Sequence, residues 1–157
     1  MTMTSEPLVA ELWCREAVPA EIRSVQERFA SRLHAAGGTG SVSVEQWGTY
    51  TYADSAVTDR SDCERVVAAI QRWADRVGSD LEPAFEIYEG SGIAEGESRT
   101  IVRLPITCLL LYDNEVLREV TPCTVDGRTY TVADAITALE TEPFDGTFPI
   151  AGYPDTR

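Results

Sequence analysis

The sequence predicts an α+β protein in which helices pack on one face of a mixed β-sheet. Two segments repeat apolar residues at helical spacing, and several shorter segments alternate apolar and polar residues. Most of the alternating segments fall in the second half of the chain. The expected order is therefore β-α-β-α-β-β-β-α, which is typical of an α+β layer sandwich. A small three-stranded parallel unit followed by hairpins is the alternative arrangement.

The first half of the domain predicts a strand, a helix and a second strand. Residues 8–15 alternate between apolar and polar side chains, as a half-buried strand does. Pro19 suits the first turn of a helix, and the glycines after residue 36 end it. Alternation resumes over 41–52, and a helical crossover allows this strand to lie parallel to the first. The apolar stripe of the helix is Ile22, Val25, Phe29, Leu33 and Ala36.

A capping box and an apolar stripe predict a second helix. Ser61 and Glu64 have the S-x-x-E spacing of a capping box, and Gly78 supplies a helix stop. The stripe between them is Val66, Ile70, Trp73 and Val77.

Two further strands are predicted after this helix. A short strand is expected over 84–89, and Arg99–Tyr112 reads as one long strand. Residues 108–111 are apolar at successive positions, which predicts that the long strand is central in its sheet.

Turn residues and a third cap organise the rest of the domain. Residues 113–115 predict a turn back into a strand over 116–121, and Asp126-Gly127 predicts a second hairpin. Thr131 and Asp134 resemble a capping box, which opens a short helix through Leu139.

The chain length suits one domain with flanking segments. With 157 residues, a single core is sufficient. We expect a disordered N-terminus over 1–7, a single α+β domain over 8–140, and an extended tail over 141–157 that is rich in proline and aromatic residues. The tail either packs on its own domain or docks on a second subunit. In the docking interpretation its anchors are Phe144, Phe148 and Tyr153.

The charge composition indicates that the protein works in concentrated salt. The chain has thirteen arginines and no lysine against 26 acidic residues, which gives a net charge of −13. Halophilic proteins use such a surplus because concentrated salt screens the repulsion. Because no signal peptide and no membrane span is seen, we expect a protein of the halophile cytoplasm with no membrane partner.

The residue types needed for catalysis are sparse, so we expect no enzyme, no cofactor and no metal. Cys14, Cys63, Cys108 and Cys123 contain no C-x-x-C pair and read as buried reduced thiols. A composite zinc site from Cys14, Cys108 and Cys123 is the alternative. The single histidine, His34, lies near the predicted end of the first helix, where the helix dipole explains it.

The second predicted helix carries a row of arginines. Arg65, Arg72 and Arg76 recur at spacings of seven and four, which places them on one exposed stripe beside the apolar face. One explanation is a solvated face paired with acids such as Asp75. The functional explanation is contact between the guanidinium groups and phosphates of a nucleic acid.

Several short motifs resemble a family of small haloarchaeal proteins that are labelled helix-turn-helix domain-containing. The motifs are Leu12-Trp13, Val44-Glu45-Gln46-Trp47-Gly48, Trp73-Ala74-Asp75-Arg76, Leu81-Glu82-Pro83, Leu104-Pro105-Ile106-Thr107-Cys108-Leu109, Thr121-Pro122-Cys123 and Tyr130-Thr131-Val132. The resemblance implies association with DNA. It supplies no catalytic residues. A helix-turn-helix joins its helices by three or four residues, whereas 37–60 separate the first two helices predicted here.

Two functions follow from the sequence. The first is a non-enzymatic, halophilic, cytoplasmic binding or regulatory module, associated with DNA as the resemblance implies. The second is a homo-oligomeric protein, a homodimer in its simplest form, that binds a protein or a small ligand and has no affinity for nucleic acid.

Overall fold

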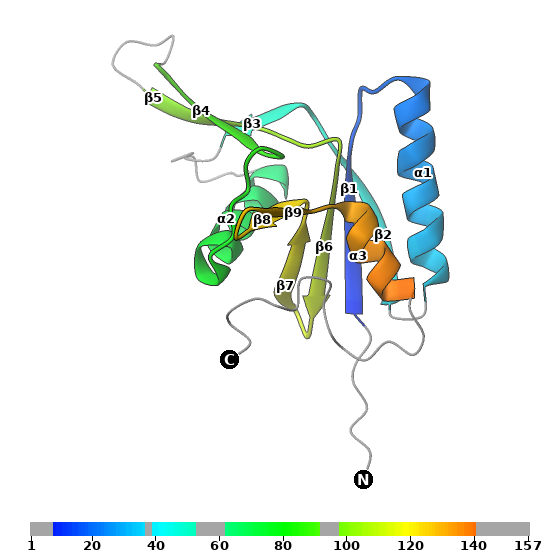
Figure 1. The fold of residues 1–157 in the computed structure, drawn as a ribbon. Helices are drawn as coiled ribbons and strands as arrows, with labels where there is room; N and C mark the ends of the chain where they lie inside the picture. Colours follow the sequence, from blue (N-terminus) through cyan, green and yellow to red (C-terminus); the bar gives the residue numbers. More distant parts are fainter. Residues whose placement is uncertain (1–7, 37–38, 53–61, 92–97, 141–157) are drawn as a thin grey trace.

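Three sheets and three helices build the part of the chain that the computed structural model describes, residues 8–36, 39–52, 62–91 and 98–140 (Figure 1). The elements are β1 (Leu8–Arg15), α1 (Ala20–Ala35), β2 (Thr39–Trp47), β3 (Tyr50–Tyr52), α2 (Asp62–Val77), β4 (Glu86–Ser91), β5 (Ser98–Arg103), β6 (Thr107–Asp113), β7 (Val116–Thr121), β8 (Cys123–Val125), β9 (Arg128–Tyr130) and α3 (Val132–Glu140). The α+β class is confirmed, and the order broadly matches the prediction. The segments 1–7 and 141–157 lie outside the described residues.

The main sheet has the order β2-β1-β6-β7. β1 runs parallel to β2, with Leu12 opposite Val44, and antiparallel to β6, with Leu12 opposite Leu109. β7 pairs with the other side of β6. The parallel first pair and the central position of the apolar β6 strand are therefore confirmed. A smaller sheet, β3-β5-β4, and the β8–β9 hairpin complete the strands.

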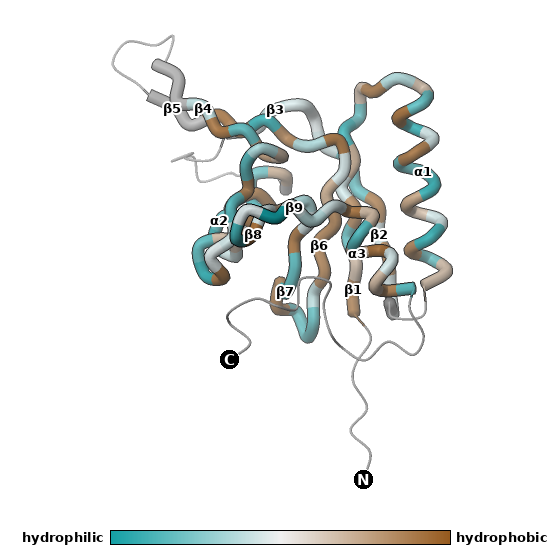
Figure 2. Tube along the Cα trace, in the orientation of Figure 1, coloured by the Kyte–Doolittle hydropathy of each residue, from teal (hydrophilic) through white to brown (hydrophobic). Residues whose placement is uncertain are grey.

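Helices cover both faces of the main sheet, which corrects the prediction that they pack on one face. Leu109 and Leu111 of β6 pack with α3 and with Leu33 of α1. Cys108 and Leu110 point the other way and pack with residues of α2. Figure 1 shows α1 and α3 together on one side and α2 on the other, and Figure 2 shows apolar stretches along β1 and β6 between them. A strand that is apolar on both faces needs cover on both.

Two predicted strands are each divided between two sheets. The segment 41–52 forms β2 and then β3, which break at Gly48-Thr49. Arg99–Tyr112 forms β5 and then β6, which break around Pro105, a residue that has no N–H to donate to a ladder. The two breaks lie together, because the Leu104 N–H donates to the Thr49 carbonyl at 2.8 Å and the Trp47 indole N–H donates to the Pro105 carbonyl at 3.2 Å.

The turns and caps follow the local sequence closely. Asp126 and Gly127 both adopt positive φ and join β8 to β9, as predicted. Gly78 has φ 74° and ends α2. The α3 capping box is complete: the Asp134 N–H donates to the Thr131 hydroxyl at 3.1 Å, and the Thr131 N–H donates to the Asp134 carboxylate at 2.9 Å. These features are local, and the sequence predicted each of them.

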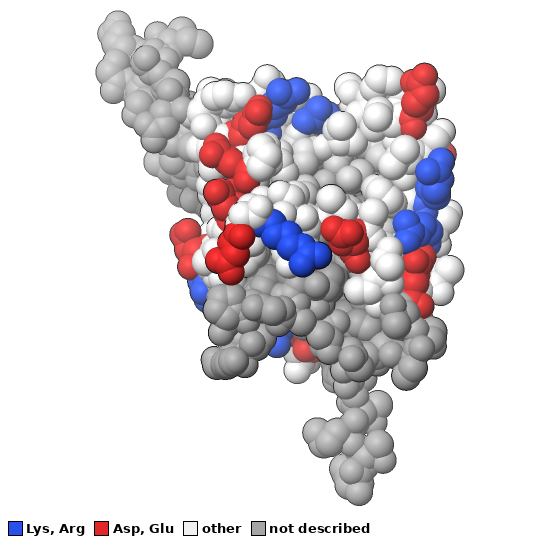
Figure 3. All heavy atoms as spheres, in the orientation of Figure 1, with Lys and Arg blue, Asp and Glu red and all other residues white. Residues whose placement is uncertain are grey.

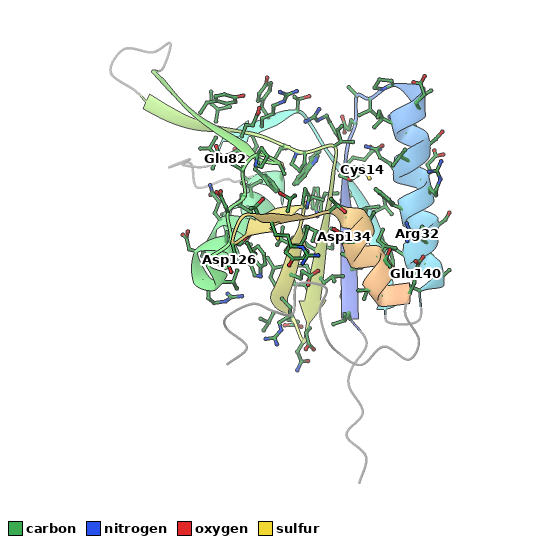
Figure 4. All side chains as sticks on the ribbon, viewed as in Figure 1. Cys14, Arg32, Glu82, Asp126, Asp134 and Glu140 are labelled. Atoms are coloured by element: carbon green, nitrogen blue, oxygen red, sulfur yellow. The ribbon has the colours of Figure 1, made fainter. Side chains whose placement is uncertain are left out.

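An ion pair joins α1 to α3 on the outer side of this layer. The Arg32 guanidinium donates to both carboxylate oxygens of Glu140, at 2.8 and 2.9 Å. Figure 4 shows the two side chains next to each other at the ends of their helices. The same contact lowers the pKa of Glu140 from its ordinary value. Arg32 thus ties the end of α3 to α1.

Gln26 fastens α1 to one end of the main sheet, and no sequence pattern singled it out. It lies between Ile22 and Phe29 of the apolar stripe and is 3% exposed. Its amide donates to the Arg15 carbonyl at 3.2 Å and to the Ile106 carbonyl at 3.1 Å. One side chain thereby holds the end of β1 beside the start of β6.

Replacing Gln26 by Leu should lower the free energy of unfolding by about 1–3 kcal/mol, because the Arg15 carbonyl loses this donor and the Ile106 carbonyl keeps only the Arg15 N–H. Urea denaturation of Gln26→Leu would measure this loss. Glu27→Gln, an exposed change at the next position, should leave stability within about 0.5 kcal/mol. Equal stabilities for Gln26→Leu and the wild type would show that the two carbonyls do not depend on this amide.

Candidate nucleic-acid interface

The α2 helix lies on the main sheet through a fully buried apolar stripe. Val67, Ile70 and Trp73 are each at most 1% exposed, and they share a core with Leu110 of β6 and Val120 of β7. The Trp73 indole N–H also donates to the Arg118 carbonyl of β7 at 3.1 Å. Ile70 and Trp73 of the predicted stripe are therefore in the docking face of this helix, together with Val67, which the prediction left out, whereas Val66 and Val77 are only partly buried. This docking face fixes which side of α2 points outward.

The outward side of α2 carries the three arginines that the sequence singled out. Arg65, Arg72 and Arg76 are all exposed. At 100° per residue their directions differ by about 40° at most, so they form one row along the helix axis. We call these three residues the arginine row. From its first to its last member the row is about 16 Å long.

Asp75 does not neutralise the row in the described structure. Within residues 62–91 and the other described segments, neither Arg72 nor Arg76 forms an ion pair. No pairing with Asp75 is therefore seen at these two arginines. Arg72 presents its guanidinium to solvent.

Arg76 also has a structural contact. Its guanidinium donates to the Leu117 carbonyl of β7 at 3.0 Å. β7 is an edge strand, and edge strands expose unpaired backbone groups. Arg76 and Trp73 together occupy two successive carbonyls of this edge. Sequence reasoning missed this role, because the contact joins residues 41 positions apart.

The arginine row belongs to a chain that is acidic overall. The chain has a net charge of −13, and Figure 3 shows basic side chains in small groups next to acidic ones on the face that contains α1 and α3. Arginine and acidic side chains therefore alternate there instead of forming a broad basic surface. Any contact with a polyanion must depend on local guanidinium groups, not on the field of the whole molecule.

The cysteines do not assemble into the composite zinc site considered above. Cys108 and Cys123 are buried in the core on the α2 side, whereas Cys14 is buried on the opposite face of the sheet. Burial raises the pKa of the Cys108 thiol well above its ordinary value, which favours the neutral thiol. Among the described residues, no group of three or more histidine, cysteine or acidic side chains is placed to hold a metal ion.

Three predicted site residues cannot be placed in the fold. Phe144, Phe148 and Tyr153, the expected anchors of the tail, lie outside the described residues. Each helix in the described segments is too short or too polar to cross a membrane.

Fold and surface together define an α+β protein that presents a row of arginines on one helix. The chain matches the family model for a helix-turn-helix domain over residues 2–143, and it belongs to this family. No curated protein and no solved structure matches it. Within the described residues, no two helices are joined by a short turn: β2 and β3 separate α1 from α2, and six strands separate α2 from α3.

Proposed function

We propose that the protein is a non-enzymatic, DNA-associated regulatory module of a halophilic cytoplasm, and that α2 is its contact with the phosphate backbone. Membership in a helix-turn-helix family supports association with DNA. The observation that carries the choice of α2 is the exposed arginine row, in which Arg72 has no acidic partner in the described structure. Guanidinium groups bind phosphate oxygens through charge-assisted hydrogen bonds.

The length of the row fits the width of a DNA groove. The major groove of B-DNA is about 12 Å wide, and the row extends about 16 Å. A helix laid across the groove would bring Arg65 to phosphates on one rim and Arg76 to phosphates on the other. Arg72 lies between them and contacts a third phosphate. Phosphate contacts of this kind position the protein, and base contacts give sequence preference.

Salt sets the strength of this contact. Each phosphate neutralised contributes about −0.9 to the slope of log affinity against log salt, so three contacts give about −2.7. Affinity then falls roughly 40-fold between about 50 and 200 mM salt. In a salt-rich cytoplasm the remaining affinity must come from shape and base contacts. DNA fragments from the native genome, tested in concentrated KCl, are therefore the appropriate ligand.

Replacing Arg72 by Ala should weaken DNA binding roughly three- to tenfold at about 0.1 M salt and make the salt slope less steep by about 0.9. Fluorescence anisotropy with labelled genomic fragments at several KCl concentrations measures both quantities. Thermal melting of Arg72→Ala should match the wild type, since its side chain holds no partner among the described residues.

Arg28→Ala is the matched control for this measurement. Arg28 is an exposed arginine on α1, which packs on the opposite face of the main sheet from α2. The control makes the same change in net charge and should leave affinity and salt slope unchanged. Equal losses from the two variants would mean that net charge, and not α2, governs binding, and no binding by the wild type would reject the proposal.

The homo-oligomeric alternative, without affinity for nucleic acid, is favoured by one observation. The outer edge of β2 carries exposed residues and pairs with no further described strand. This edge and the arginine row belong to different elements, so the two can be tested separately.

A further inference from the structure

The two edges of the main sheet differ in how their backbone groups are used. At one edge, the Arg76 and Trp73 side chains donate to carbonyls of β7, and α2 covers that strand. At the other edge, β2 pairs with β1 and with no other strand of the described chain. Unpaired edges attract other strands, and native proteins usually block them. Within the described segments, one edge of the main sheet is blocked and the other is available.

β2 is long enough to pair and is well exposed. It extends over nine residues, Thr39–Trp47, and Ser41, Val44, Glu45 and Gln46 are exposed. The Val44 side chain is 46% exposed, although Val42 on the same face of the sheet packs against the core. A second strand beside β2 would cover this valine. β2 carries no proline. Its one register irregularity lies at its start, where Leu8 pairs with Thr39 but Val9 pairs with Ser41, and from Ser41 to Trp47 the register is regular.

The hydrogen bonds to β1 establish which backbone groups of β2 face outward. The Trp47 carbonyl accepts the Glu16 N–H at 2.9 Å, so the backbone groups of Trp47 point toward β1. Backbone direction alternates along a strand, and Ser43 and Glu45 therefore also point inward. Val42, Val44 and Gln46 direct their N–H and C=O groups away from the sheet. These three residues are available for an added strand.

We propose that β2 pairs with β2 of a second copy of this chain, antiparallel and about a two-fold axis at Ser43. In this register Val42 of one copy lies opposite Val44 of the other, and both have outward backbone groups, as hydrogen-bonded antiparallel partners require. The valines form two cross-strand apolar pairs. Because of the two-fold axis, each contact between the two copies occurs twice, and both copies use the same edge of β2.

Charge favours this register and this partner. Glu45 is the one charged residue of β2, and here it lies opposite Ser41 of the second copy. The two Glu45 side chains are then four residues apart along the ladder, about 14 Å, which exceeds the Debye length of about 10 Å at 0.1 M salt. A register centred on Glu45 would place the two carboxylates side by side. The acidic chain can therefore join itself along β2 without opposing its charges directly.

Mass in solution tests the dimer. Light scattering of the full chain should give twice the 17.2 kDa of the monomer. Val44→Pro removes an outward N–H, which an edge strand tolerates when that N–H faces solvent, and should give the monomer mass with an unchanged far-UV spectrum. Val44→Thr keeps the N–H and the branched shape, and should remain dimeric. A monomeric wild type, or a dimer that Val44→Pro leaves intact, would overturn the proposal.

Cross-linking tests the register independently of any proline effect on folding. At the two-fold axis the two Ser43 residues form a non-hydrogen-bonded pair, with Cα atoms about 4.5 Å apart, within the range of a disulfide. Ser43→Cys should therefore give a covalent dimer with a mild chemical oxidant, and a reductant should reverse it. Ser41→Cys is the matched control and should stay monomeric on a denaturing gel. Cross-linking at Ser41 but not at Ser43 would exclude this register.

Discussion

Replacing Trp73 by Ala should lower the free energy of unfolding by about 3–5 kcal/mol, the range for truncation of a large buried aromatic side chain. Trp73 is 1% exposed, lies in the core that joins α2 to the sheet, and donates its indole N–H to the edge strand β7. Its loss removes apolar contacts, leaves a cavity and removes the indole donor from the Arg118 carbonyl. Chemical denaturation in concentrated KCl is the appropriate measurement.

Two companion variants separate these contributions. Trp73→Phe keeps most of the apolar contact and loses the hydrogen bond, so its cost in unfolding free energy should include about 1 kcal/mol for that bond and stay well below the Ala value. Tyr50→Ala, at a side chain that is 58% exposed, should change stability by no more than about 0.5 kcal/mol. A loss for Trp73→Ala as small as that of Tyr50→Ala would contradict the docking of α2 described above.

Trp73→Ala also connects the stability of the fold to the proposed function. α2 can carry an ordered arginine row only while its apolar stripe holds it on the sheet. Trp73→Ala should therefore reduce DNA affinity at temperatures where the rest of the protein remains folded, whereas Arg72→Ala reduces affinity without loss of stability. Comparison of the two variants distinguishes a residue that positions the helix from one that contacts the ligand.

Local chemistry explains which parts of the fold the sequence predicted. The stop at Gly78, the hairpin at Asp126-Gly127 and the Thr131–Asp134 capping box depend on residues that are neighbours in the chain, and all three are confirmed. The breaks at Gly48 and Pro105 depend on contacts between distant segments. Alternation continued across both breaks, so the sequence predicted one strand where the structure has two.

The placement of helices on both faces of the main sheet also depends on tertiary contacts. The apolar stripes of α1 and α2 predict that each helix packs on a sheet, but a stripe does not say on which face. The signal that bears on the question was in β6, where residues 108–111 are all buried and alternate between the two cores. A strand of this kind requires cover on both sides. Its apolar run predicted the central position and also implied a second layer.

In the candidate site, too, the sequence predicted the features that depend on local periodicity and missed the contacts between distant segments. Helical periodicity placed the arginine row on one exposed side of α2, and the structure has all three residues exposed. The contact of Arg76 with Leu117 joins residues that are 41 positions apart in the sequence. The hydrogen bonds of Gln26 reach as far as Ile106, which is 80 positions away. A polar residue inside an apolar stripe was the available signal for Gln26. Arg76 had no comparable signal, because the position of the β7 edge depends on the tertiary fold.

The melting temperature should rise by roughly 10–20 °C between dilute buffer and about 2 M KCl, because of the surplus of acidic side chains. The formal charge is −13. If each uncompensated carboxylate experiences a repulsion of about 0.2–0.5 kcal/mol from its neighbours, the folded state loses about 3–6 kcal/mol in low salt. At about 1 M salt the Debye length is about 3 Å, and most of this repulsion disappears. Calorimetry over a range of KCl concentrations measures the effect.

High salt also strengthens apolar burial, so a charge-neutralised variant is needed to isolate the electrostatic part. Glu27→Gln, Glu45→Gln and Glu115→Gln together remove three exposed carboxylates, none of which has a partner in the described structure. This variant should be more stable than the wild type in dilute buffer, and the two should converge in concentrated KCl. An identical response to salt in both proteins would locate the salt effect in apolar burial, and the acidic surface would then need another explanation.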